Sequence, residues 1–242
     1  MRKIKRMFGS LQTGKPVGFV ALWLNKDCEY RAGAKEEQET GAKIENAFQW
    51  AREQGVKMYG RFGSRWSSER QYFTFWLCPS FEILDETMDR LTAAGDFKFA
   101  DSEHIVGLQL DDTELTDKVA IHEIPDLKRK SESPLGFLAL WNMKDASFHA
   151  PEQEWDETDR AVRDVFLRAR DRGVLTFGNY NCRWSSRWDY FTFMIIPDMQ
   201  TLDWFISELE PAGDFKFADS RHIIGIAEPQ YRFGVHLQRY TE

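Results

Sequence analysis

The sequence predicts an α+β protein that contains the same βαββαβ unit twice. Residues 18–107 align with residues 136–225 at a constant offset of 118 without a gap, and about 40 of these 90 positions are identical. In each copy, short apolar runs bounded by Pro or Gly alternate with longer segments that have helical periodicity. A residue retained in both copies is therefore expected to serve the shared fold or a shared site.

The first half of the unit reads as strand, helix and strand pair. Residues 17–24 form a short apolar run, which predicts a strand. Apolar residues then recur at the helical spacing i, i+3, i+4 and i+7, at Ile44, Ala47, Phe48 and Ala51. This pattern predicts a helix with one apolar face, and Gly55 is expected to end it. Residues 56–62 and 70–77 predict two strands, and the second is apolar on both faces, so it should be covered on both sides.

The second half of the unit adds a helix and a final strand. Residues 81–91 predict the helix, with Ser80 as its N-cap and Gly95 at its end. A loop over residues 96–102 then leads to a strand over residues 104–110. The second copy repeats these elements at the aligned positions, so we expect two domains, residues 1–110 and 136–242, joined by a polar linker over residues 111–135. The tail after Glu228 is partly aromatic and could cover an edge or a cavity mouth.

Composition excludes several classes of function. The net charge of −7 argues against a nucleic-acid partner, since phosphate backbones need a basic surface. No apolar stretch approaches 18 residues, so no membrane span is expected. The three cysteines (Cys28, Cys78 and Cys182) occupy unrelated positions in the two copies, which predicts reduced thiols in a cytoplasmic protein. Phosphate-binding loops, a nucleophile elbow and a metal-ligand cluster are not found in the sequence, so no cofactor is predicted.

The repeated βαββαβ order, with its doubly apolar strand Tyr72-Phe73-Thr74-Phe75-Trp76-Leu77, resembles the ferredoxin-like fold. Two such repeats packed together resemble the dimeric α+β-barrel superfamily, here fused into an intramolecular pseudo-twofold barrel. The resemblance implies a monomer that could dimerise further, and a small-molecule cavity between sheet and helices or inside the barrel. The superfamily includes cofactor-free monooxygenases, isomerases, polyketide cyclases and haem enzymes, so the fold implies no single reaction.

A four-residue motif in the connection between the second and third strands is a candidate substrate site. It comprises Arg65, Trp66, Ser67 and Ser68 in one copy and Arg183, Trp184, Ser185 and Ser186 in the other. A guanidinium beside an indole and hydroxyl groups could hold a carboxylate. The alternative is a turn whose serines bond their own backbone while the indole plugs the end of the core.

Histidines near the start of the last strand are candidate catalytic groups. The residues are His104 and His222, each preceded at three residues by a carboxylate, Asp101 or Asp219. A histidine with an orienting carboxylate could act as a general base. The alternative is a histidine that bonds a loop carbonyl.

A second acidic pair, Asp96 and Asp214, is also retained in both copies. Each lies two residues before a lysine, Lys98 or Lys216, so surface ion pairs are expected.

Together these residues predict an enzyme acting on an aromatic or carboxylate-bearing metabolite by proton transfer or cofactor-free oxygenation. A non-catalytic binding or scaffold protein is the main alternative. A haem protein and an RNA-binding module are remoter ones; the latter shares the βαββαβ order but needs glycines and a basic charge that this chain lacks. The sequence alone does not decide between enzyme and binder.

Overall fold

The structure of the chain, a computed structural model, describes residues 15–28, 33–110 and 134–228. These residues contain eight strands and seven helices. The first half comprises β1 (Val17–Asn25), α2 (Ala34–Glu53), β2 (Lys57–Gly63), β3 (Tyr72–Cys78), α3 (Phe81–Ala94), α4 (Asp96–Phe99) and β4 (Ala100–Gln109). The second half comprises β5 (Leu135–Met143), α6 (Asp145–His149), α7 (Glu152–Asp171), β6 (Leu175–Asn181), β7 (Tyr190–Ile196), α8 (Met199–Ala212), α9 (Asp214–Phe217) and β8 (Ala218–Ala227).

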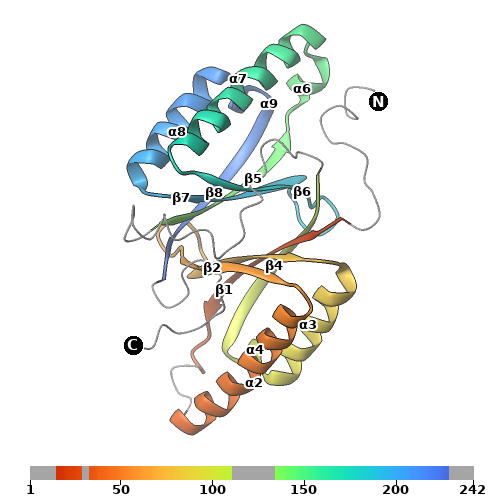
Figure 1. Cartoon of the computed structure of the whole chain (residues 1–242), viewed down its shortest axis with the longest axis vertical. Coiled ribbons are helices and arrows are strands. Elements are labelled where there is room, and N and C mark those ends of the chain that lie inside the picture. The colour runs from red at the N-terminus through yellow and green to blue at the C-terminus, as the bar shows by residue number, and fades with distance from the viewer. Residues whose placement is uncertain (1–14, 29–32, 111–133, 229–242) are drawn as a thin grey trace.

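The eight strands close into one barrel, in the order β1-β3-β2-β8-β5-β7-β6-β4. Figure 1 shows the strands in the middle of the molecule and the helices of the two halves at opposite ends. All of the pairings are antiparallel. Pairing within each half is long, whereas β2 meets β8 over two residue pairs and β4 meets β6 over two. The closure of the barrel therefore needs support beyond its strand hydrogen bonds.

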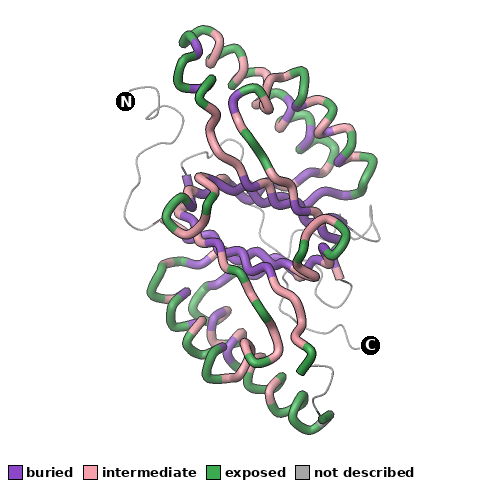
Figure 2. The backbone as a smooth tube through the Cα atoms, turned by 180° about the vertical axis from the view of Figure 1, so that it is seen from behind, coloured by how far each residue is buried: buried purple, intermediate pink, exposed green. Residues whose placement is uncertain are grey.

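The barrel interior is a hydrophobic core to which both halves contribute. Figure 2 shows that the buried residues concentrate in the strands, while the outer helices are largely exposed. Phe73 and Phe75 of β3 meet Phe191 and Phe193 of β7 inside, and the rings of Phe75 and Phe193 stack at 4.6 Å. On its other face β3 presents Trp76 to the helices. The expected coverage of this strand on both sides is confirmed.

Two pairs of glycines let an aromatic ring from one half lie directly on the strands of the other. Gly18 and Gly107 are opposite each other in β1 and β4, and the ring of Tyr180 from β6 covers them. A Cβ atom at Gly18 would be 2.5 Å from that ring, and one at Gly136 would be 2.6 Å from the ring of Phe62. Such contacts are possible only without a side chain, so these glycines are needed where the two halves meet.

The predicted helix ends are confirmed. Gly55 and Gly95 have φ of 90°, the left-handed conformation that ends a helix. The Ser80 hydroxyl accepts a hydrogen bond from the Ile83 amide, as expected of an N-cap.

One predicted boundary is wrong. Residues 96–99 form the short helix α4 rather than a loop, and the last strand begins at Ala100, four residues before the predicted start. Residues 101 and 104 therefore both lie on a strand. The predicted linker, apart from its last two residues, and the tail after Glu228 lie outside the described residues.

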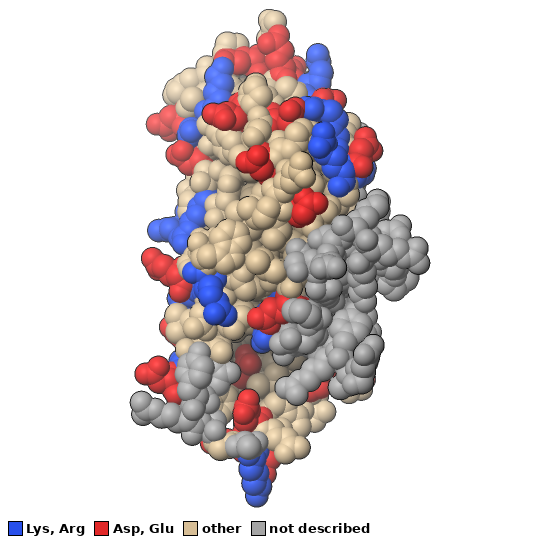
Figure 3. Space-filling model, turned by 90° about the vertical axis from the view of Figure 1, so that its left-hand side faces the viewer, with Lys and Arg blue, Asp and Glu red and all other residues tan. Residues whose placement is uncertain are grey.

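The surface carries both signs of charge. Figure 3 shows acidic and basic side chains interspersed over the face that it presents. In the described part of the chain, no helix is both long and apolar enough to cross a membrane.

Candidate functional site

The Arg-Trp-Ser-Ser motif lies where the two halves join. The Ser67 hydroxyl donates to the Ile224 carbonyl of β8 at 2.5 Å and accepts from the Ile224 amide at 3.0 Å. Ser185 does the same with Val106 of β4, at 2.6 and 3.0 Å. Each serine hydroxyl thus bonds both the carbonyl and the amide of one strand residue, as a paired strand would, at a junction where strand pairing is short. The bonds within the turn that the alternative predicts are also present, from Ser67 to the Ser64 carbonyl at 3.2 Å and from Ser185 to the Cys182 carbonyl at 3.1 Å. The bonds across the junction were not predicted from the sequence.

The other members of the motif point away from the core. Arg65 is exposed, and Trp66 and Trp184 are each about half exposed. Trp184 lies over Phe81, the first residue of α3, at 5.3 Å between ring centroids. Arg183 donates to the hydroxyl of Tyr190 at 2.5 Å. The idea that the indoles plug the core is wrong, and the substrate-binding role of the motif stays a prediction.

The expected contact between Asp101 and His104 is absent. Residues three apart on a strand point to opposite faces, so the early start of β4 separates them. Asp101 instead pairs with Arg70 at 3.3 Å, and Asp219 pairs with Lys144 at 3.2 Å. Neither aspartate orients its histidine, whatever chemistry the histidines perform.

Both histidines pack between phenylalanine rings on the helix side of the sheet. His104 lies 5.1 Å from Phe19 and 5.7 Å from Phe97, measured between ring centroids. His222 has the same arrangement, with Phe137 at 4.9 Å and Phe215 at 6.1 Å. Burial lowers the pKa of each imidazole, which favours the neutral form.

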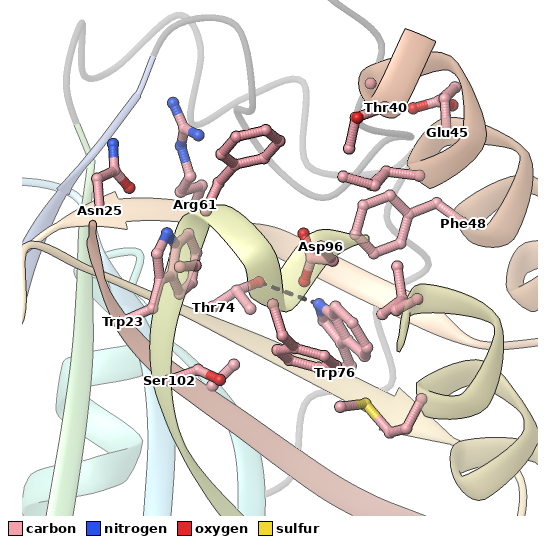
Figure 4. A pocket seen from close by; sticks show the side chains of 18 of the residues that line it. Trp23, Asn25, Thr40, Glu45, Phe48, Arg61, Thr74, Trp76, Asp96 and Ser102 are labelled. Atoms are coloured by element: carbon pink, nitrogen blue, oxygen red, sulfur yellow. Dashed lines mark hydrogen bonds between the residues drawn. The ribbon is translucent and has the colours of Figure 1, made fainter. Parts of the chain in front are cut away.

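A large pocket lies between the sheet and the helices of the first half. Its volume is about 980 Å³, which is within the range of small-molecule sites. Figure 4 shows Trp23, Asn25 and Arg61 on the strand side, and Thr40, Glu45 and Phe48 on α2. The aromatic side chains of the lining are Phe19, Trp23, Phe48, Trp76, Phe97 and Phe99, and His104 joins them from β4.

Two polar groups of the lining are held by other residues. The Trp76 indole donates to the Thr74 hydroxyl at 3.1 Å, and that hydroxyl donates to the Gly60 carbonyl at 2.5 Å. Arg61 donates from Nε to Glu228 at 2.6 Å, and its guanidinium lies 4.9 Å from the centroid of the Tyr72 ring. Both arrangements fix the wall of the pocket in one conformation.

Asp96 is a site residue that sequence reasoning missed. It begins α4 and lines the pocket, and burial raises the pKa of its carboxyl group from 3.8 to about 6. The expected pair with Lys98 is wrong, because Lys98 bonds Glu36 of α2, and Lys216 likewise bonds Glu154. The sequence does contain one indication of this role, because the aspartate is retained in both copies between a glycine and a phenylalanine. Burial of this residue matters more for its environment than the lysine two positions later.

The second half has a tryptophan where the pocket of the first half has a glutamate. Trp155 of α7 occupies the position aligned with Glu37 and stacks on Phe217 at 4.4 Å. Its indole nitrogen donates to the Ser147 carbonyl of α6 at 2.6 Å. Phe217 is buried, whereas its counterpart in the pocket, Phe99, is only partly so. The strands of the two halves thus follow the same order, while the residues at this place differ.

The fold is shared with structures of known proteins. Chlorite dismutase from Candidatus Nitrospira defluvii, in complex with imidazole, matches with a TM-score of 0.66 and 11% identity over 95% of this chain and 96% of that one. A haem-binding protein from Thermus thermophilus matches with a TM-score of 0.68 and 13% identity over 92% of this chain and 93% of that one. No protein-family model and no curated protein matches the sequence. At these identities the likeness shows a chlorite dismutase-like fold.

Proposed function

We propose that the chain binds a small, flat, largely apolar molecule in the pocket of its first half. The observation that carries this proposal is a pocket of about 980 Å³ with six aromatic side chains in its lining. Rings on several sides of a cavity favour an aromatic ligand, through stacking and edge contacts. Within this proposal each half is a ferredoxin-like repeat, and the second repeat serves as the structural partner that completes the barrel.

The pocket also contains groups suited to proton transfer. A general base works best when its pKa is near the ambient pH, and the Asp96 carboxyl, with a pKa of about 6, meets that condition. His104 belongs to the same lining, and burial lowers the pKa of its imidazole, which favours the neutral form. An enzyme that moves a proton on its bound ligand is therefore compatible with the pocket, with Asp96 as the general base, the role that the sequence assigns to His104. Binding without catalysis needs only the aromatic walls.

Haem is a second candidate ligand, favoured by the haem-binding protein of the same fold and by His104 in the lining. An imidazole can hold haem iron, but the propionates also need cationic partners. Arg61 is the one lysine or arginine in the described part of the lining, and it is already engaged with Glu228. The described lining therefore offers an iron ligand for haem, but no free cation for its propionates.

Filling the pocket tests the proposal. The variant Glu37→Trp places in the first half the residue that the second half has at the aligned position, Trp155. Isothermal titration with 1-naphthalenemethanol, a neutral aromatic probe, should show binding to the unaltered protein and at least tenfold weaker binding to this variant. Glu39→Trp is the matched control, because Glu39 lies on the same helix outside the lining. Absence of binding to the unaltered protein, or equal loss in both variants, would contradict the proposal.

A haem titration separates the second candidate. If haem binds through His104, its Soret band should shift on binding, and the shift should be lost in His104→Ala and kept in His222→Ala. The two histidines have equivalent ring contacts, so the pair controls for general effects of removing an imidazole. Identical spectra for both variants would remove His104 as the iron ligand.

A further inference from the structure

We propose that the pocket of the first half selects a ligand in which an aromatic body carries a positively charged amine, held by the carboxylate of Asp96. This inference rests on the proposed function and adds the chemical class of the ligand. It also reverses the charge expected from the sequence, where a carboxylate-bearing metabolite is predicted.

The charge of the lining is negative. Its ionisable side chains other than His104 are Glu37, Glu45, Asp96 and Arg61. Arg61 is neutralised by Glu228, and Glu45 bonds Arg52 at 2.7 Å. Among the described residues, Asp96 and Glu37 have no side-chain ion pair or hydrogen bond. Within the described lining, a ligand that brings an anion into this space would meet carboxylates without a free cation to offset them.

The environment of Asp96 makes its charge available to a ligand. Nearby lysines are engaged elsewhere: Lys98 bonds Glu36, and Lys26 donates to the Phe97 carbonyl at 3.0 Å. A carboxylate removed from water and without a partner is costly, and an ammonium group entering the pocket would relieve that cost. The rise in the pKa of Asp96 has the same cause, burial without a compensating charge.

The aromatic walls add to the attraction. A cation near the face of Trp, Tyr or Phe is stabilised by the ring quadrupole, most strongly with Trp. The lining contains Trp23 and Trp76 in addition to four phenylalanines. In Figure 4 the side chains of Phe48, Asp96 and Trp76 border the same part of the pocket. Rings together with a carboxylate are the combination that recognises amines and ammonium groups.

Three probes of one shape test the inference. They are 1-naphthylmethylamine, 1-naphthalenemethanol and 1-naphthoate, which are positive, neutral and negative at pH 7.5. By isothermal titration we expect the amine to bind at least tenfold more tightly than the carboxylate, with the alcohol between them. Asp96→Asn keeps the side-chain shape and removes the charge, so it should bring the amine-to-carboxylate ratio close to one.

Asp214→Asn is the matched control. Asp214 has the equivalent place in the second half, and burial raises the pKa of its carboxyl to about 6 as well, but there Trp155 stands where the pocket has Glu37 and stacks on Phe217. This variant should keep the full preference for the amine. Equal effects of the two substitutions would overturn the role of Asp96, since they would reveal a property of the fold and not of the pocket.

A pH series gives a second reading. Protonation of Asp96 should lower the amine-to-carboxylate ratio of the unaltered protein as the pH falls from 7.5 to 5. The other charged groups that face this space are Glu37 and Glu45 from α2, Arg61 from β2 and His104 from β4. Protonation of His104 would act in the same direction, so the comparison with Asp96→Asn decides: its ratio should change much less over the same range.

The outcomes separate this inference from the proposed function. If the alcohol binds and charge makes no difference, the inference is wrong and the aromatic pocket stands. If the carboxylate binds best, the sequence-based expectation of an anionic ligand is restored. If none of the three probes binds, both proposals fail.

Discussion

Neutralising Asp96 should make the ligand-free protein more stable. Burial raises the pKa of this carboxyl from 3.8 to about 6 in the folded state. The folded state therefore binds the proton more tightly than the unfolded state, and stability falls as the pH rises from about 4 through about 6. A shift of about two pKa units, at about 1.4 kcal/mol per unit, corresponds to a penalty of up to about 3 kcal/mol above pH 6. Asp96→Asn removes that penalty.

Urea denaturation at two pH values measures the effect. At pH 7.5 the free energy of unfolding of Asp96→Asn should exceed that of the unaltered protein by about 1–3 kcal/mol. Below pH 4 the difference should shrink towards zero, because the aspartate is then protonated in both states. Asp101→Asn is the control; this side chain is exposed and paired with Arg70, so its change should stay under about 1 kcal/mol.

Two results would refute the reasoning. A loss of stability in Asp96→Asn at pH 7.5 would mean that the carboxylate makes a stabilising interaction. A gain that persists unchanged below pH 4 would mean that its origin is not the ionisation of Asp96. The same experiment on Asp214→Asn should give a gain of similar size, since burial raises that pKa to about 6 too.

Further predictions concern the junction between the halves. Ser67→Ala leaves the amide and carbonyl of Ile224 without this partner and should cost about 1–3 kcal/mol, seen as a lower Tm. Gly107→Ala places a Cβ atom 2.7 Å from Tyr180 and should cost about 1–3 kcal/mol in urea denaturation. Residues 1–111 expressed alone would expose the inner face of their sheet, so size-exclusion chromatography should show association or aggregation in place of a folded monomer.

Controls for these variants come from the same chain. Ser207→Ala removes an exposed hydroxyl that bonds within α8, and it should change the Tm little. Gly41→Ala lies in α2 with open space around it and should stabilise the helix by about 1 kcal/mol. Losses at Ser207 as large as at Ser67, or a stable monomer of residues 1–111, would contradict the view that the halves depend on each other.

Local sequence patterns predict most of the elements. Apolar stripes and caps indicate α2 and α3 together with their ends, because these depend on residues close in the sequence. The start of β4 does not follow from such patterns, since Asp96–Phe99 form a single helical turn, which is too short to show helical periodicity in the sequence. Because the sequence pattern places the strand start four residues too late, Asp101 is expected to lie in a loop next to His104, and the two are wrongly paired.

Retention in both copies identifies important residues without revealing why they are important. The sequence places Ser67 and Ser185 among the substrate ligands, and the structure shows them bonding the strands of the opposite half. The sequence predicts Asp96 as half of a surface ion pair, although its carboxyl lies in the pocket lining. Retention between repeats does not distinguish a residue that joins the halves from one that faces a ligand, since both depend on distant parts of the chain.

The sequence by itself determined the duplication, the order of the elements and the amphipathic faces, all of which follow from short-range periodicity. The tertiary structure decided which residues line the pocket of the first half and what charge they bring to it. The second half differs at this place because Trp155 stands where the first half has Glu37, and the Ser147 carbonyl of α6 accepts a hydrogen bond from its indole, which stacks on Phe217. Whether a large side chain fills a space or points into solvent depends on neighbours that only the folded chain brings together.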